Sequence, residues 1–322
     1  MRVFFAAAAF LVATCLLAQD KAEDTLAAVI GVQAKIQSNA RSAESLGTQR
    51  RGSGVLIRDD YVLTIGYLVT EAEAIHLIGA DGRTVPATIA AYDHASGFAL
   101  LRAVGSLNAK PIALGDATAL AEREPALVIP APSREAPTLV HVVSRRPFSG
   151  SWEYMLDSAI FTYPPVADWS GAPLIGAKGE LLGIGSLIVP DAGAPGTQSP
   201  GNMFVPVDLL KPILEDLIAD GRRRGPARPW LGVNADELRG HLFVSRVSPE
   251  GPAERAGLRA GDIVVAVSGE HVSTLAEFYR RIWGRGGAGV DVPIRVLQGA
   301  QLREVSVRSI DRVDYFRASK TY

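Results

Sequence analysis

The sequence contains a single cysteine, Cys15, among its 322 residues, and this cysteine lies within an apolar N-terminal segment. Arg2 supplies a positive charge before the segment, residues 3–18 carry no charge, and Ala18 is a small residue suited to cleavage. The pattern predicts a signal peptide over residues 1–18; the alternative is an uncleaved anchor, for which the apolar run is short. A cleaved chain would have no cysteine, which excludes disulfides, zinc–thiolate sites and a cysteine nucleophile.

An excess of charge of one sign is also lacking, because 33 Lys and Arg residues face 34 Asp and Glu residues, a formal net charge of −1. The densest basic cluster is Arg222–Arg224, which lies where a helix is expected to end and where cations compensate the helix dipole. The composition therefore favours neither a nucleic-acid partner nor, once the signal peptide is removed, a membrane span. We expect no cofactor and no bound metal.

Glycine and proline, in contrast, are abundant, at 32 and 20 residues. Between residues 26 and 206, short runs of Val, Ile and Leu alternate with turn residues, and both Asp81-Gly82 and Lys178-Gly179 have the composition of tight hairpin turns. Many short strands at this spacing are typical of sandwiches and barrels. Because about 180 residues are too many for one small barrel, we expect two barrels in this part of the chain.

Helical patterns are few and occur later in the chain. Apolar residues recur at helical spacing over Val207–Asp220, and Gly221 is suited to end that helix. A linker rich in Arg, Gly and Pro follows over residues 223–229. Another helix is expected after Thr274, where Glu277 completes the spacing of a capping box.

The string Pro252–Ile263 places Gly257 where a helix needs a left-handed cap and Gly261 where a tight turn leads into a strand. This string closely resembles PDZ domains. Ahead of it, Trp230-Leu231-Gly232-Val233 matches the loop that binds a peptide's terminal carboxylate through backbone N–H groups in the PDZ domains of proteases. The resemblance implies a binding site for peptides or unfolded proteins with free, apolar C-termini.

Four further segments resemble the HtrA/Deg family of trypsin-like serine proteases in order and spacing: Gly52–Ile57, Ala172–Ile175, Gly179–Ile184, and Val205-Pro206 followed by a helix. The resemblance covers almost all of the mature chain. It implies an all-β dominated fold, namely a trypsin-like double six-stranded β-barrel followed by a C-terminal PDZ domain, itself a β-sandwich with two helices. The implied boundaries are 1–18 for the signal peptide, 19–222 for the double barrel, 223–229 for the linker, 230–310 for the PDZ domain and 311–322 for a tail.

The same resemblance identifies the positions of the catalytic residues, and most of them are substituted. Such enzymes need a Ser nucleophile, a His base and an Asp that orients the His. Ser170 occupies the nucleophile position, but Tyr67 stands in place of the His and Gly97 in place of the Asp. Asp168 stands in place of a Gly of the oxyanion hole, where a carboxylate opposes the negative charge of the intermediate.

Three hypotheses follow from this pattern. The first is a pseudoprotease of the bacterial envelope that binds peptides through its PDZ domain, and the second is an active endopeptidase in which Ser170 uses an unconventional base, His94 being the first candidate. The third is a structural subunit with a closed PDZ groove, in a mixed oligomer with HtrA-like paralogues. Family resemblance alone implies a homotrimer or such a mixed oligomer. An imidazole or amine beside Ser170 would favour the second hypothesis, and an occluded Leu231–Val233 edge would favour the third.

Overall fold

The computed structural model describes residues 20–131 and 136–316, so the predicted signal peptide over residues 1–18 lies outside the described residues. The chain divides into two compact units. Of the described residues, the first unit comprises those up to Arg145 together with Ala159–Arg223, and the second comprises Arg146–Ser158 together with residues 224–316. In the part of the chain that the structure describes, no helix is long and apolar enough to cross a membrane.

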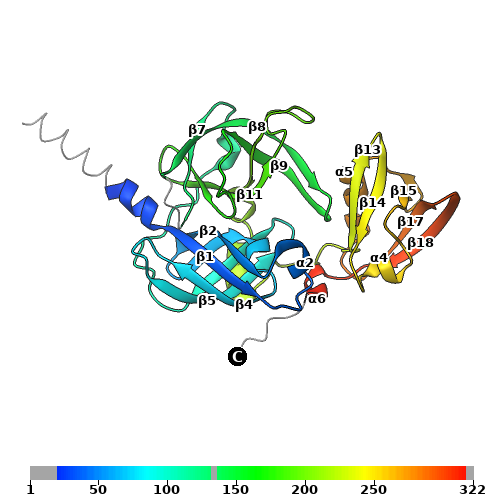
Figure 1. The fold of residues 1–322 in the computed structure, drawn as a ribbon, viewed down its shortest axis with the longest axis horizontal. Helices are drawn as coiled ribbons and strands as arrows, with labels where there is room; N and C mark the ends of the chain where they lie inside the picture. The colour runs from blue at the N-terminus through cyan, green and yellow to red at the C-terminus, as the bar shows by residue number, and fades with distance from the viewer. Residues whose placement is uncertain (1–19, 132–135, 317–322) are drawn as a thin grey trace, which may run out of the picture. The chain divides into compact units, whose positions relative to one another are not determined.

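The N-terminal half of the first unit is a closed barrel of six strands in the order β1-β2-β3-β6-β5-β4 (Figure 1). Its elements are β1 (Val29–Ile36), α2 (Ala43–Leu46), β2 (Gln49–Arg58), β3 (Tyr61–Ile65), the 3₁₀ turn η1 (Gly66–Leu68), β4 (Ala72–Ile78), β5 (Thr84–Asp93) and β6 (Phe98–Ala103). Apolar side chains such as Leu56, Leu63 and Leu100 are fully buried inside it. Buried residues run almost continuously along β1, β3 and β6, whereas buried and more exposed residues alternate along β4.

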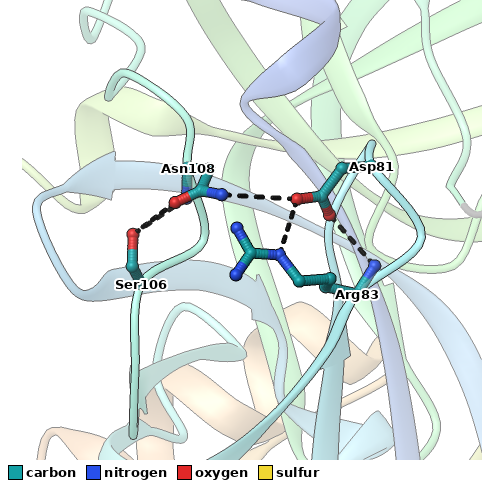
Figure 2. A network of polar contacts seen from close by, with 4 residues as sticks. All are labelled: Asp81, Arg83, Ser106 and Asn108. Atoms are coloured by element: carbon teal, nitrogen blue, oxygen red, sulfur yellow. Dashed lines mark hydrogen bonds and ion pairs between the residues drawn. The ribbon is translucent and has the colours of Figure 1, made fainter.

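The predicted turn at Asp81-Gly82 joins β4 to β5, and Gly82 takes a φ of +78°. Figure 2 shows how side chains hold this turn: the Asp81 carboxylate accepts hydrogen bonds from the backbone N–H of Arg83 at 3.0 Å and from its Nε at 2.9 Å. Asn108 Nδ2 donates to the same carboxylate at 3.4 Å, and Ser106 Oγ donates to Asn108 Oδ1 at 2.8 Å. The turn prediction is confirmed, and the network links it to the segment after β6.

A second closed barrel of six strands, in the order β10-β11-β12-β9-β8-β7, completes the first unit and confirms the double barrel. Its elements are the 3₁₀ turn η2 (Ala117–Ala119), β7 (Pro125–Val128), β8 (Thr138–Gly150), β9 (Tyr154–Tyr163), β10 (Pro173–Ile175), β11 (Leu181–Val189) and β12 (Gly201–Pro206). Its core includes Ile160, Leu174 and Phe204.

The helix predicted over Val207–Asp220 is shorter than expected. The segment begins as a 3₁₀ turn, η3 (Val207–Leu209), and only α3 (Leu214–Asp220) is α-helical. The physical reason is Pro212, which lacks an N–H donor and disfavours helical angles at the residue before it. Gly221 ends α3 as predicted, with a φ of +71°.

The second unit contains an antiparallel sheet in the order β13-β14-β15-β17-β18, with β16 paired to β15 (Figure 1). Its elements are β13 (Val233–Leu238), β14 (His241–Val247), α4 (Pro252–Arg255), β15 (Ile263–Val267), β16 (Glu270–His271), α5 (Leu275–Trp283), β17 (Asp291–Gln298), β18 (Gln301–Arg308) and α6 (Arg312–Tyr315). The capping box is confirmed, because the Thr274 side chain accepts from the Glu277 N–H at 3.2 Å and the reciprocal bond is present. One face of α5 packs onto the sheet through Phe278, Tyr279 and Ile282.

The outer half of the β8–β9 hairpin, residues 146–158, is part of this second unit rather than of the first. Met155 in this hairpin is buried in the same hydrophobic core as Leu231 and Val233. Nothing in the sequence pattern indicated that a hairpin between two barrel strands would supply side chains to the core of the second unit.

Candidate functional site

Ser170 lies in a tight turn that the backbone holds on two sides. Its carbonyl oxygen accepts from the Ser53 N–H at 2.8 Å, and the following Gly171 N–H donates to the Gly185 carbonyl at 2.9 Å. Gly171 has a φ of +73°, and a Cβ at this position would lie 2.0 Å from the Ser53 carbonyl oxygen. Only glycine fits there, so the geometry of the turn requires Gly171 irrespective of catalysis.

Tyr67, on η1 directly after β3, contacts Ser170. The Ser170 hydroxyl donates to the Tyr67 hydroxyl at 2.8 Å, and the Tyr67 hydroxyl donates in turn to the Ser186 carbonyl at 2.9 Å. The backbone carbonyl of Tyr67 accepts from Arg50 Nη1 at 2.6 Å, which fixes this part of η1. The Tyr67 proton is therefore engaged with a carbonyl, and its oxygen acts as an acceptor for Ser170.

A phenol in this position is a poor base. Burial raises the pKa of Tyr67 to about 12, although hydrogen bonds from Ser170 and Trp169 oppose that shift. Because the ordinary pKa of tyrosine is about 10, the phenolate is even rarer here at neutral pH than in water. Tyr67 thus serves Ser170 as a hydrogen-bonding partner and does not abstract its proton.

Gly97, at the position expected for Asp, closes the turn between β5 and β6 with a φ of +83°. Its N–H donates to the Asp93 carbonyl at 2.7 Å, and its carbonyl accepts from the Gly66 N–H at 2.7 Å. The nearby Asp93 carboxylate is engaged elsewhere: it accepts from the Ser96 N–H at 2.9 Å and from Arg223 Nη2 at 2.9 Å. This carboxylate stabilises the turn and Arg223.

The remaining candidates are placed as follows. Asp168 is exposed two residues before Ser170, and its backbone lies outside the left-handed region. The His94 ring stands 4.2 Å from the ring of Tyr92, centroid to centroid. Among residues 20–131 and 136–316, the Ser170 hydroxyl hydrogen-bonds to Tyr67 and to no imidazole or amine. The structure therefore brings together Tyr67 and Ser170, while position 97 supplies no side chain.

The predicted carboxylate loop, residues 230–233, leads into edge strand β13. Trp230 pairs with Ile310 through two backbone hydrogen bonds of 3.0 and 3.1 Å, and Gly232 takes a φ of +82°. Leu231 and Val233 are buried. The three N–H groups of residues 231–233 converge on one group, and that group is the carboxylate of Glu153.

Glu153 lies at the end of the β8–β9 hairpin turn and was not among the residues that the sequence suggested. Its Oε1 accepts from Gly232 N at 2.6 Å and from Val233 N at 2.9 Å, and its Oε2 accepts from Leu231 N at 3.0 Å. The side chain is buried, and burial raises the pKa of Glu153 although the three backbone donors oppose the shift. No local signal could have revealed it, because the carboxylate and its donors are 78 to 80 residues apart in sequence.

No group of three or more His, Cys, Asp or Glu side chains within the described ranges is arranged to hold a metal ion.

Two family matches cover parts of the chain. Residues 52–184 match the trypsin-like peptidase domain, and residues 243–295 match the PDZ domain. The chain is 29% identical over 277 residues to a probable periplasmic serine protease of Haemophilus influenzae, described as do/HhoA-like. It is also 29% identical over 242 residues to the periplasmic serine endoprotease DegP of Escherichia coli.

These alignments cover 80% and 70% of this chain but only 57% and 50% of the two relatives, so the chain spans about half the length of the curated relatives it matches. Among solved structures, a serine endoprotease from Yersinia pestis matches with a TM-score of 0.54 at 23% identity, covering 91% of this chain and 97% of that one. The HtrA-type protease AlgW with a decapeptide matches with a TM-score of 0.55 at 20% identity, covering 92% and 98%. The structural matches show the shared fold.

Proposed function

The chain belongs to the HtrA/Deg family, and we propose that it is a member without ordinary proteolytic activity that binds peptides or unfolded proteins through its PDZ domain. The observation that carries the proposal is the hydrogen bond from the Ser170 hydroxyl to the Tyr67 phenol at 2.8 Å. A serine becomes nucleophilic when a base accepts its proton, and here the acceptor is a phenol whose own pKa is raised to about 12.

The missing elements act together. Loss of the base or the nucleophile of a triad costs about a millionfold in turnover, and the losses do not add because the residues work as a unit. Position 97 offers no carboxylate to orient an imidazole, and its positive φ is one that glycine adopts without strain. By the family resemblance, Asp168 replaces a Gly of the oxyanion hole, where its negative charge would oppose that of the intermediate.

Two features support peptide binding. The backbone N–H groups of residues 231–233 form a row that donates to a carboxylate, and the adjoining strand β13 is an edge strand. A peptide that adds a strand to this edge would place its terminal carboxylate on the loop.

The two curated relatives named above are described as periplasmic proteins, and together with the predicted signal peptide they support a location in the bacterial envelope. Mass spectrometry of the native protein should then find residues 1–18 absent.

Cleavage of unfolded casein tests the catalytic part of the proposal. Wild type and Ser170→Ala, purified from a host that lacks its own envelope proteases, should both leave casein intact. Cleavage by wild type that disappears in Ser170→Ala would contradict the proposal and direct the search for a base to His94.

A second candidate function is a structural subunit with a closed PDZ groove, as a homotrimer or within a mixed oligomer of HtrA-like paralogues. The observation that favours it is the Glu153 carboxylate on the carboxylate loop. Binding of peptides with a free C-terminal carboxylate, weakened when that terminus is amidated, separates the two candidates, since amidation removes the charged partner of the backbone donors.

A further inference from the structure

We propose that Glu153 is an internal ligand of the PDZ domain: the β8–β9 hairpin occupies the peptide-binding groove of its own chain, and a peptide with a free terminal carboxylate binds in competition with it. The proposal rests on the proposed function, because it assumes that the groove is a peptide site. All the residues that carry it belong to the second compact unit.

The first observation is how the Glu153 carboxylate is held. Three consecutive backbone N–H groups donate to it at 2.6 to 3.0 Å, and both carboxylate oxygens are used. Only 6% of the residue is exposed, so water does not compete for these donors. Backbone N–H groups arranged in this way are how proteins capture the terminal carboxylate of a peptide. The Glu153 side chain supplies the same charged group from within the chain.

The second observation is a strand-like hydrogen bond beside the carboxylate. The N–H of Ala235 in β13 donates to the Ser151 carbonyl at 3.0 Å. Ser151 lies two residues before Glu153, and Ala235 lies two residues after Val233, so the pairing continues outward from the carboxylate along the edge of β13. An added peptide strand pairs with a sheet edge at alternate residues in the same way. Residues 151–153 thus act as the last three residues of a bound peptide.

Helix α5 also holds the hairpin, through Tyr279. The hydroxyl of Tyr279 donates to the Gly150 carbonyl at 2.6 Å and accepts from the Glu153 N–H at 3.1 Å. Met155 is buried in the core that contains Leu231 and Val233, where an apolar side chain of a peptide would otherwise be received. Loop, strand edge and helix are therefore all engaged by one hairpin.

The hairpin is nevertheless an imperfect ligand. Glu153 has a φ of +55°, a left-handed conformation that costs free energy for a residue other than glycine. Burial of its carboxylate is also unfavourable, which is why the pKa of Glu153 is raised. A free peptide needs no left-handed residue, since its carboxylate is at the end of the chain. The hairpin compensates through covalent attachment, which gives it an effective concentration in the millimolar range.

The test measures peptide affinity of the full-length mature protein by fluorescence anisotropy. The probe is an equimolar mixture of fluorescein-labelled ten-residue peptides that end in Val, Leu or Phe with a free carboxylate. Glu153→Ala should bind the mixture at least tenfold more tightly than wild type. The gain is limited to about a thousandfold, which is the ratio of a millimolar effective concentration of the hairpin to a micromolar dissociation constant. Asp157→Ala is the matched control: it removes a carboxylate from the same hairpin, but this side chain is 85% exposed and stands 3.6 Å from Arg280.

A second measurement reports the internal ligand without any peptide. Amide hydrogen exchange at Leu231, Gly232 and Val233 should be slow in wild type and Asp157→Ala, and at least tenfold faster in Glu153→Ala. Unchanged exchange in β18 verifies that the variant is folded; if Glu153→Ala does not fold, Glu153→Gln, which keeps an acceptor oxygen without the charge, takes its place.

Faster exchange together with tighter peptide binding supports the proposal. Equal exchange rates in wild type and Glu153→Ala would overturn the proposal. It would also be overturned if exchange were faster in Glu153→Ala but both proteins bound the peptides with equal affinity. Faster exchange with no binding of any peptide to either protein would support the internal ligand and overturn the proposed peptide-binding function.

Discussion

Replacement of Tyr67 by Phe should destabilise the barrel unit, because the Tyr67 hydroxyl stabilises the fold where an active protease would use an imidazole. The hydroxyl connects Ser170 to the carbonyl of Ser186. Ser186 is the extra residue of a bulge in β11: Gly185 pairs with Phe204 and Leu187 with Met203. A bulge leaves its extra residue out of the ladder, so the Ser186 carbonyl depends on the hydroxyl of Tyr67.

The magnitude follows from the burial of that carbonyl. Ser186 is only 5% exposed, and a buried acceptor that loses its donor costs about 1–3 kcal/mol. For a unit of this size, 1 kcal/mol corresponds to about 2–4 °C in Tm, so Tyr67→Phe should lower Tm by about 2–12 °C. Ser170→Ala removes one hydrogen bond but leaves the Tyr67–Ser186 bond in place, and should cost only about 0.5–1.5 kcal/mol.

Urea unfolding of four proteins tests this reasoning: wild type, Tyr67→Phe, Ser170→Ala and the double variant. Because Tyr67→Phe already removes the acceptor of the Ser170 hydroxyl, the double variant should be more stable than the sum of the single effects predicts, by about 0.5–1.5 kcal/mol. Tyr163→Phe makes the same chemical change at a side chain that is 53% exposed, and should stay within about 0.5 kcal/mol of wild type. Equal stabilities of Tyr67→Phe and Tyr163→Phe would refute the structural role of the Tyr67 hydroxyl.

Three further predictions concern the same unit. A raised pKa keeps an acid protonated to higher pH, and the pKa of Tyr67 is raised to about 12. Only about 1% of the protein therefore carries a phenolate at pH 10, and casein assays from pH 6 to 10 should show no cleavage at any pH. Tyr67→His alone should not restore cleavage, and casein cleavage by this single variant would contradict the expectation. The triple variant that adds Gly97→Asp and Asp168→Gly should be less stable by about 1–2 kcal/mol in urea unfolding, because position 97 has a φ of +83°, which aspartate adopts only with strain. Gly171→Ala should lower the free energy of unfolding by more than about 3 kcal/mol, because its Cβ would lie 2.0 Å from a carbonyl oxygen. The control is Gly196→Ala, where φ is a similar +74° but the surroundings are open, and this variant should lose only about 1–2 kcal/mol. Similar unfolding midpoints for the two variants would show that the contact with the carbonyl oxygen does not destabilise Gly171→Ala.

The parts of the fold that local patterns specify could be predicted from the sequence. The turn at Asp81-Gly82 and the capping box at Thr274 depend on residues a few positions apart, and both are present. The helix after Val207 was predicted too long, because the apolar spacing outweighed the single Pro212 that interrupts it. Patterns of neighbouring residues therefore predicted the turn and the capping box correctly, and they failed only where a second pattern, the proline at 212, opposed the first.

The candidate site could be predicted only in part. Resemblance placed Tyr67 at the position that faces Ser170, and the two hydroxyls are indeed hydrogen-bonded. It also predicted a carboxylate loop at residues 230–233, where the N–H groups of 231–233 hold the Glu153 carboxylate, a residue that the resemblance did not suggest. Glu153 lies in an ordinary hairpin turn with a positive φ, and its partners are 78 to 80 residues further along the chain. Neither composition nor periodicity therefore distinguishes it from a surface glutamate.

The pairing between Ser151 and Ala235 also bears on colloidal stability. Strand β13 ends the sheet order, and exposed edge strands are templates on which other chains add strands and aggregate. The hydrogen bond from Ala235 to Ser151 places the hairpin on this edge beside residues 231–233, so another chain cannot pair with Ala235 while the hairpin is in place. A cover of this kind would let the sheet keep an edge strand that can bind other strands without copies of the protein adding to one another.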